Sequence, residues 1–176
     1  MSRFLLSAVV ILAGVSMAMA APTTFNVVFS GSLEVPNPAP GDPDGFASGT
    51  ITFDPAALGS PVYGEISWNI TYSNIAAPIG FHIHTGNAGS EGGILIGLGT
   101  TTSGGGGTLI HTYNDSNWNT EWNIPEINSI LANPSGFYLN IHTGDFADGA
   151  VRAQLPEPAS LGLLLVGATA LLRRRG

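Results

Sequence analysis

Three of the four histidines in the chain lie in two short segments with alternating residue types. His82 and His84 lie in segment 79–85, and His142 lies in segment 137–143. Alternation of apolar and polar residues is typical of a β-strand that packs one face against a core. The histidines occupy the polar positions of both segments, so we expect them outside the core, on the wet face of a sheet. This placement makes them the first candidates for function.

The spacing of these histidines suits a transition metal. His82 and His84 are two residues apart on a strand, which puts their Cα atoms about 6.6 Å apart on one face. Imidazole nitrogens bind both copper and zinc, at about 2.0–2.1 Å in the case of zinc. If His142 lies on a neighbouring strand, the three side chains form a site for copper, or alternatively for zinc, with one coordination position open. The other interpretation is structural, with each histidine hydrogen-bonded to loop backbone or to an acidic turn. The fourth histidine, His111, is expected at the surface.

Acidic residues dominate the charge of the middle of the chain. Residues 22–155 contain eleven acidic side chains and one basic side chain, Arg152, so their net side-chain charge is −10. A polyanion has no electrostatic basis for binding nucleic acid or an anionic lipid surface. Arg152 is either the partner of a carboxylate or the guide of an anion near the histidines. We favour the carboxylate partner, with Asp145 or Asp148 as its acid.

The elements that position these residues are short strands. Glycine and proline are frequent, at 24 and 12 of 176 residues, and they separate alternating segments. The strands are expected at 24–33, 46–53, 62–72, 79–85, 93–100, 108–113, 137–143 and 150–155. Many short strands joined by turn residues favour an antiparallel sandwich or barrel, with one dry face on each sheet. The chain has no cysteine, so core burial alone must hold the fold.

The alternation also predicts which side chains form the core. In segment 79–85 the apolar positions are Ile79, Phe81 and Ile83. The residues expected to face inward are Ile66, Trp68, Ile70, Phe81, Ile83, Leu139, Ile141, Val151 and Leu155.

One short helix is expected after Trp122. Pro125 suits a first helical turn, and Ile127, Ile130 and Leu131 share one face of such a helix. We interpret this helix as a packing element across one end of the sandwich. Trp122 is expected in the core or a lid, although an exposed pair with Trp118 would stack on polysaccharide.

The two ends of the chain look like targeting segments. Arg3, an apolar run and Ala18-Met19-Ala20 predict a signal peptide over residues 1–20, recognised by Sec-type export machinery and cut by signal peptidase after Ala20. At the other end, residues 159–172 are apolar, shorter than the roughly 20 residues that span a bilayer upright. This segment predicts an anchor whose tail is removed after sorting, or alternatively an ordinary membrane anchor.

The last 21 residues, 156–176, resemble the bacterial PEP-CTERM sorting signal. The resemblance rests on the cue Pro156-Glu157-Pro158, the apolar segment 159–172, and the cluster Arg173, Arg174 and Arg175. It implies a Gram-negative source, transient membrane anchoring through 159–172, and processing by an exosortase-type protease. It also implies delivery to the cell surface or the exopolysaccharide matrix.

The domain between these ends, residues 24–155, resembles the CHRD domain, first described in chordin and common in bacterial secreted proteins. The matching segments are GFHIHTGNAGSEGGIL (80–95) and GFYLNIHTGDFADGAVRAQL (136–155). The landmarks in them are His82, His84, Tyr138, Asn140, His142, Thr143, Gly149, Arg152, Gln154 and Leu155, preceded by the run Leu33-Glu34-Val35-Pro36. The chain departs from the family pattern at Ala150 and Val151, where an acidic residue usually precedes the arginine.

The same landmarks show a fainter resemblance to copper–zinc superoxide dismutases. This resemblance implies a Greek-key β-sandwich in which His82, His84 and His142 match three copper ligands. It also implies that Arg152 matches the arginine that guides the anion. The chain departs from that family in three respects: no histidine follows soon after His84 at the metal-bridging position, the zinc ligands are absent as a set, and no disulfide can form.

The sequence therefore predicts an all-β, antiparallel, Greek-key-like sandwich with one short helix and leaves two functions open. The first is a non-enzymatic CHRD-domain protein exported to the cell surface or extracellular matrix, with exopolysaccharide as a partner. No spacing suggests a nucleophile oriented by a base, which favours this first function. The alternative is a copper- or zinc-binding module, or a superoxide-dismutase-like metalloenzyme, that uses His82, His84 and His142.

Overall fold

The computed structural model describes residues 21–35, 40–57, 59–99, 107–111 and 122–157, without the side chains of residues 110 and 111. The predicted signal peptide, Trp118, the side chain of His111 and nearly all of the predicted sorting segment lie outside these residues. Within the described part, no helix is long and apolar enough to span a membrane.

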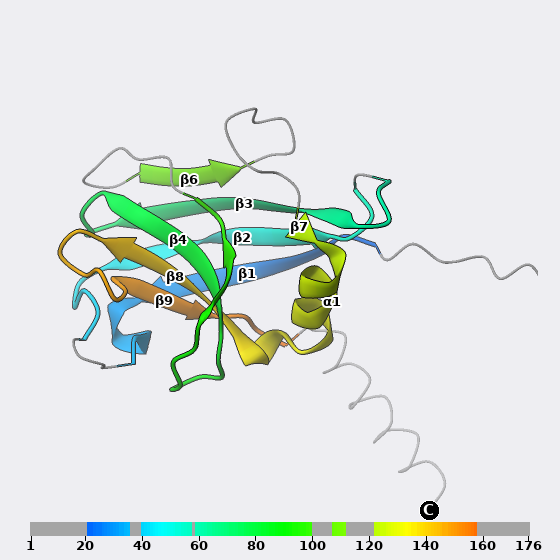
Figure 1. Cartoon of the computed structure of the whole chain (residues 1–176). Coiled ribbons are helices and arrows are strands. Elements are labelled where there is room, and N and C mark those ends of the chain that lie inside the picture. Colours follow the sequence, from blue (N-terminus) through cyan, green and yellow to red (C-terminus); the bar gives the residue numbers. More distant parts are fainter. Residues whose placement is uncertain (1–20, 36–39, 58, 100–106, 112–121, 158–176) are drawn as a thin grey trace, which may run out of the picture.

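The described chain is built mainly of strands (Figure 1). They are β1 (Thr23–Ser30), β2 (Phe46–Asp54), β3 (Tyr63–Ser73), β4 (Pro78–Thr85), β5 (Ile94–Gly97), β6 (Gly107–His111), β7 (Trp122–Asn123), β8 (Phe137–Thr143) and β9 (Val151–Gln154). The helix is α1 (Ile124–Ala132), and two 3-10 turns are η1 (Gly31–Leu33) and η2 (Pro134–Gly136). All eight expected strands are present, and the short β7 is an addition that sequence alternation does not indicate.

The strands form one curled antiparallel sheet that folds back on itself. Their order is β5-β4-β8-β9-β1-β2-β3-β6, with β7 paired to β3. Four strands separate β3 from β4 in this order, yet the rings of Trp68 and Phe81 on these two strands lie 5.8 Å apart. In Figure 1, β4, β8 and β9 cross in front of β1, β2 and β3. The sheet thus has two layers, and the crossings after β3 and β5 give it the expected Greek-key-like, sandwich-like form.

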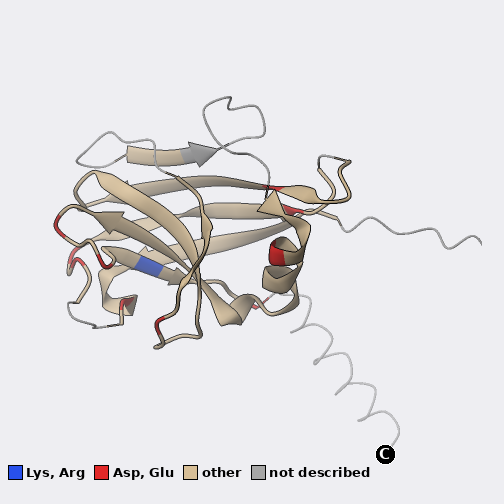
Figure 2. Cartoon of the chain, viewed as in Figure 1, with Lys and Arg blue, Asp and Glu red and all other residues tan. Residues whose placement is uncertain are grey.

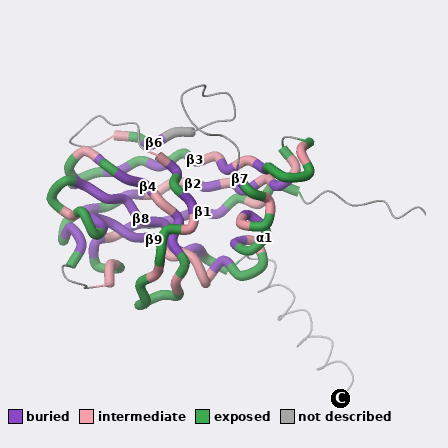
Figure 3. Tube along the Cα trace, in the orientation of Figure 1, coloured by how far each residue is buried: buried purple, intermediate pink, exposed green. Residues whose placement is uncertain are grey.

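The core fills the space between the two layers, as the alternation predicts. Figure 3 shows buried and exposed positions alternating along the strands at the back of the molecule. All nine side chains expected to face inward are buried. Aromatic rings join the layers, since Phe29 on β1 and Trp68 on β3 both contact Phe81 on β4. Phe81 therefore stands at the centre of the core, on the face of β4 opposite to the two histidines of the same strand.

Helix α1 closes one end of the sandwich (Figure 1). Pro125 lies in its first turn, Ile127 and Ile130 are buried, and Leu131 packs against the core at its edge. Trp122 just before the helix is also buried, with its ring 6.2 Å from that of Trp68. The expected packing helix is confirmed, and Trp122 is a core residue and does not form a sugar platform.

Ile79 does not face the core, contrary to the alternation of segment 79–85. Its side chain is 62% exposed. The pairing register between β4 and β8 shifts between Pro78 and Gly80, so the residue between them falls out of phase with Phe81 and Ile83. A one-residue irregularity of this kind reverses the face that a side chain occupies.

Candidate metal centre

Pairing between β4 and β8 brings the three histidines onto one face. The register places His84 opposite Tyr138, His82 opposite Asn140, and Gly80 opposite His142. His82 and His142 are therefore diagonal neighbours, close enough for long side chains to touch. Because Phe81, Ile83, Leu139 and Ile141 face the core, the histidines face the opposite side of the same strands.

The three imidazoles converge in space. One ring nitrogen from each of His82, His84 and His142 lies within 4.8 Å of the others. The ring centroids of His82 and His142 are 4.8 Å apart, and His84 lies 5.7 Å from each of them. Nitrogens bound tetrahedrally at 2.0–2.1 Å lie about 3.3 Å apart. Small rotations of the side chains would thus bring the three nitrogens to a shared ion.

The outer face that carries these histidines is not wet, and this corrects the sequence expectation. His84 is only 7% exposed and His142 only 8%. The turn between β4 and β5 covers His84, and the turn between β8 and β9 covers His142, as their hydrogen bonds show. The alternation correctly separates the histidines from the apolar core, but these two turns form a second cover that alternation does not reveal.

Two backbone carbonyls fix the tautomers of the buried imidazoles. The Nδ1 atom of His84 lies 3.0 Å from the carbonyl oxygen of Gly92, and Nδ1 of His142 lies 2.9 Å from that of Ala147. A carbonyl oxygen can only accept, so Nδ1–H is the donor in both rings. The lone pair of each Nε2 is then free to bind a metal, which is the arrangement that metal-ligating histidines usually adopt.

Three ring nitrogens of the cluster have no hydrogen-bond partner among the residues that the structure describes. Nε2 of His84, Nε2 of His142 and Nδ1 of His82 are buried and make no hydrogen bond. An unsatisfied buried polar atom costs about 1–3 kcal/mol, so three in one cluster require an explanation. A shared metal ion would satisfy all three, and imidazole donors fit copper and zinc.

The electrostatic environment keeps these imidazoles neutral. Burial, helped by the nearby His142 and His84, lowers the pKa of His82 to about 4. Burial also lowers the pKa of His84 and of His142, although the hydrogen bonds to Gly92 and Ala147 oppose this shift. Neutral rings offer the lone pairs that a metal requires, so protons compete little for the site at neutral pH.

Arg152 shares this face but not the metal cluster. Its guanidinium carbon lies 3.4 Å from the centre of the Tyr138 ring, and the other neighbour of that ring is His84, stacked at 4.9 Å. Since β4 and β9 flank β8 on opposite sides, Tyr138 separates the arginine from the histidines. Arg152 also donates to the carbonyl oxygen of Asn87 and to Oε1 of Gln154.

The carboxylates that act on Arg152 differ from those that the sequence favours. Glu34 and Glu91 are the acids that stabilise its charge, in place of the expected Asp145 or Asp148. In Figure 2, β9, the strand that contains Arg152, has a basic stretch in blue, and acidic turns in red lie near it. Both glutamates come from segments distant in sequence, so spacing along the chain could not identify them.

A polar cavity of about 200 Å³ adjoins the cluster on the side of Arg152. Glu34, Tyr138 and Asn140 line it together with Arg152, and His84 borders it. Sequence reasoning did not assign Glu34 or Asn140 to a site. Glu34 could have been recognised from its place in the family motif Leu33-Glu34-Val35-Pro36. Asn140 could have been recognised from its polar position in the alternating segment that forms β8.

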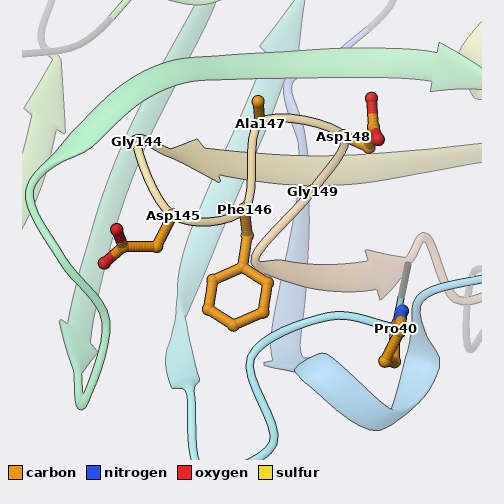
Figure 4. A pocket seen from close by; sticks show the side chains of 7 residues that line it. All are labelled: Pro40, Gly144, Asp145, Phe146, Ala147, Asp148 and Gly149. Atoms are coloured by element: carbon orange, nitrogen blue, oxygen red, sulfur yellow. The ribbon is translucent and has the colours of Figure 1, made fainter. Parts of the chain in front are cut away.

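The turn between β8 and β9 supports His142 through the carbonyl oxygen of Ala147. A shallow cavity of about 260 Å³ lies beside it, bordered by Pro40 (Figure 4). Figure 4 shows the carboxylates of Asp145 and Asp148 on different sides of the turn. Thr143 Oγ1 accepts from the Phe146 N–H at 3.2 Å, as expected for a turn that satisfies its own backbone.

Comparison with known proteins identifies one family. Residues 25–155 match the family model of the CHRD domain, which covers most of the chain. No curated protein and no solved structure matches the chain. The histidine cluster, Tyr138 and Arg152 all lie within the matched residues.

Proposed function

The chain belongs to the CHRD domain family, and from this premise we propose that it is an exported CHRD module that binds one copper or zinc ion. The ligands in this proposal are His82, His84 and His142. Copper is the preferred ion, because imidazole sites bind Cu²⁺ more tightly than Zn²⁺. The module itself is non-enzymatic.

One observation carries the proposal: three imidazoles converge, and each has a buried ring nitrogen with no hydrogen-bond partner among the described residues. A purely structural role would leave these nitrogens hydrogen-bonded, as Nδ1 of His84 and of His142 are. His84 and His142 thus each have one ring nitrogen held by backbone and a second, Nε2, without a hydrogen-bond partner among the described residues. This is the pattern expected of ligands oriented by a supporting shell.

The export and surface location are also part of the proposal. The sequence features that support them are the signal peptide at 1–20 and the resemblance of 156–176 to a PEP-CTERM sorting signal. The Sec machinery, signal peptidase and an exosortase-type protease would process the chain. The product would then lie at the cell surface or in an exopolysaccharide matrix.

Metal titration tests the histidine site. The full chain, purified without affinity tag or chelator in a detergent, is titrated with Cu²⁺ and separately with Zn²⁺ by calorimetry, and its metal content is measured. We expect one tight site that His84→Ala abolishes while the circular dichroism spectrum stays that of the folded protein. His111→Ala is the matched control, because His111 lies on β6 opposite Trp68 and should leave the affinity unchanged.

Two results would overturn the metal proposal. One is the absence of any site tighter than the millimolar range in the folded wild type. The other is equal affinity in wild type, His84→Ala and His142→Ala. The circular dichroism spectrum distinguishes loss of metal binding from loss of folding. A variant whose spectrum shows that it is unfolded does not count as a variant that has lost the metal site.

Redox chemistry at the same ion is a second candidate, favoured by the three-ligand geometry. Three histidines leave a coordination position open to an exogenous ligand. If the ion cycles between oxidation states, the copper-loaded chain should disproportionate superoxide and His84→Ala should not. A copper-loaded wild type that is inactive in this assay would leave the binding module as the function.

A further inference from the structure

The polar cavity beside the histidine cluster is built from parts of the chain that lie far apart in sequence. Glu34 comes from the segment after η1, Tyr138 and Asn140 from β8, and Arg152 from β9. The exposed rim is formed by Glu91 and Asp148. Asn140 and Arg152 are each only 2% exposed, so the floor of the cavity is polar and buried while its mouth is open to solvent.

Two acceptor atoms on residues that line this cavity have no hydrogen-bond donor among the residues that the structure describes. Oδ1 of Asn140 and Oε1 of Glu34 are buried and unpartnered, although the Nδ2 group of Asn140 donates to Oε2 of Glu34 at 3.3 Å. The two orphan oxygens lie close together, since a Cβ placed on Gly149 would be 2.7 Å from Oε1 and 2.8 Å from Oδ1. Buried acceptors in native proteins are nearly always satisfied, so a ligand that brings donors would complete this floor.

The charges around the cavity exclude several kinds of ligand. Glu91 and Asp148 at the rim would repel a phosphate, a sulfate or a uronic acid. A bare cation is disfavoured by Arg152, and among the described residues the cluster able to share an ion is that of the histidines. The cavity therefore suits a ligand that is neutral or carries one amino group, and that offers hydroxyl donors and acceptors together.

The size of the cavity limits the ligand to one small ring. Its 200 Å³ lies below the roughly 300–1,000 Å³ typical of pockets for drug-sized molecules. The faces of the Tyr138 ring are already covered by His84 and by Arg152, so recognition depends on hydrogen bonds and not on stacking. The open rim allows the rest of a polymer to continue into solvent.

We propose that this cavity binds a single sugar residue, neutral or amino-bearing, of an extracellular polysaccharide. Two sugar hydroxyls donate to Oε1 of Glu34 and Oδ1 of Asn140, and Arg152 donates to a sugar oxygen. This inference rests on the matrix location proposed above for the source of the polymer. The sugar-binding chemistry itself depends only on the cavity.

Glu34→Gln is the sharpest variant for this site. The Asn140 Nδ2 group needs an acceptor, so the amide oxygen of the new side chain takes the place of Oε2 and its NH₂ group takes the place of Oε1. This change turns an acceptor into a donor without changing the size of the side chain. Asp145→Asn is the matched control, because it removes the same charge from a turn residue that does not line this cavity.

The experiment is a titration of the ¹⁵N-labelled full chain, in a zwitterionic detergent without sugar headgroups, observed by NMR. The probes are the methyl glycosides of glucose, galactose and mannose, together with glucosamine and glucuronate. We expect at least one neutral or amino sugar to shift the side-chain amide signals of Asn140, and glucuronate not to shift them. Glu34→Gln should weaken that binding at least about tenfold, and Asp145→Asn should leave it unchanged.

Three results would overturn the sugar proposal: no shift with any sugar, equal shifts at Asn140 and at the exposed Asn133, or unchanged affinity in Glu34→Gln. If Glu34→Gln fails to fold, the Asn140 shifts of the wild type decide alone. The metal proposal and the sugar proposal can fail independently of each other, because His82 does not line the cavity. His82→Ala should lose the metal and keep the sugar, whereas Glu34→Gln should do the reverse.

Discussion

Gly80 is the residue that allows the imidazoles to converge. It lies opposite His142 on the polar face, and a Cβ there would come within 2.9 Å of Cε1 of His82 and 3.4 Å of Cδ2 of His142. Any side chain at this position would displace the His82 ring from its place beside His142. The convergence therefore requires both the histidines and the absence of a side chain between them.

Gly80→Ala is expected to weaken Cu²⁺ binding at least about tenfold, because the new methyl group displaces the His82 ring and a misplaced ligand loses affinity. Calorimetric titration of the folded variant measures the effect. Gly97→Ala is the control, because Gly97 lies beside His82 on β5 and an added Cβ would meet nothing within 4 Å. Equal affinity in both variants would show that Gly80 does not govern the site.

Glu34 should make stability depend on pH. Burial raises its pKa from 4.5 to about 7, although Arg152 and the Asn140 hydrogen bond oppose the shift. Because the folded-state pKa lies above the unfolded one, its contribution is fully present below about pH 4.5 and is lost as the pH rises through 7. Glu34→Gln should therefore gain stability relative to wild type between pH 5 and about 8.

Urea unfolding at several pH values checks the Glu34 prediction. The quantity to compare is the difference in midpoint between wild type and Glu34→Gln, which removes the contribution of all other titrating groups. Asp145→Asn serves as the charge-matched control. A difference that stays constant from pH 4 to about 8 would contradict the prediction.

At the scale of elements, two strands and the turns that follow them hold the three histidines in place. β4 and β8 set the register of the three histidines, and the turns that follow each of these strands supply the carbonyls of Gly92 and Ala147. Each histidine strand thus carries its own support at its carboxyl-terminal end. Because β4 and β8 run antiparallel, these two turns lie at opposite ends of the strand pair, and helix α1 contributes stability.

Ile127→Ala in α1 should cost about 2–5 kcal/mol of the free energy of unfolding, as expected for a buried isoleucine. Ile127 is fully buried, and its Cδ1 lies 2.8 Å from where a Cβ of Gly64 would stand, so it fills a gap on β3 that has no side chain. Asn128→Ala, at the exposed neighbouring position, is the control. Chemical unfolding measures both, and a cost for Ile127→Ala no larger than that of the control would show that α1 is not needed for the fold.

At the scale of the whole molecule, one β-domain lies between two segments predicted to direct its export. Replacing residues 156–158 with alanines should leave an uncleaved chain in the membrane fraction, because the cue for the processing protease is gone. Fractionation and immunoblotting of the native host measure this outcome. Pro43→Ala, in an exposed turn of the domain, should be released normally, and normal release of the 156–158 variant would contradict the sorting interpretation.

The sequence by itself determined which side chains face the core. The pleat of a strand sends successive residues to opposite sides, so alternation in segments 62–72, 79–85 and 137–143 is enough to identify the core face. The same local rule placed His82, His84 and His142 on the polar faces of their own strands, and the pairing of β4 with β8 brought them together. The family motifs are local patterns too, and they marked the boundaries of the domain.

Only the tertiary structure decided what covers that other face. Burial of His84 and His142 depends on turns that fold back over them, and the partners of Arg152 come from Glu34 and Glu91, far away in the chain. Ile79 departs from alternation because of a shift in pairing with a strand that follows about 60 residues later. These features depend on contacts between distant segments, and the period of a single strand carries no information about them.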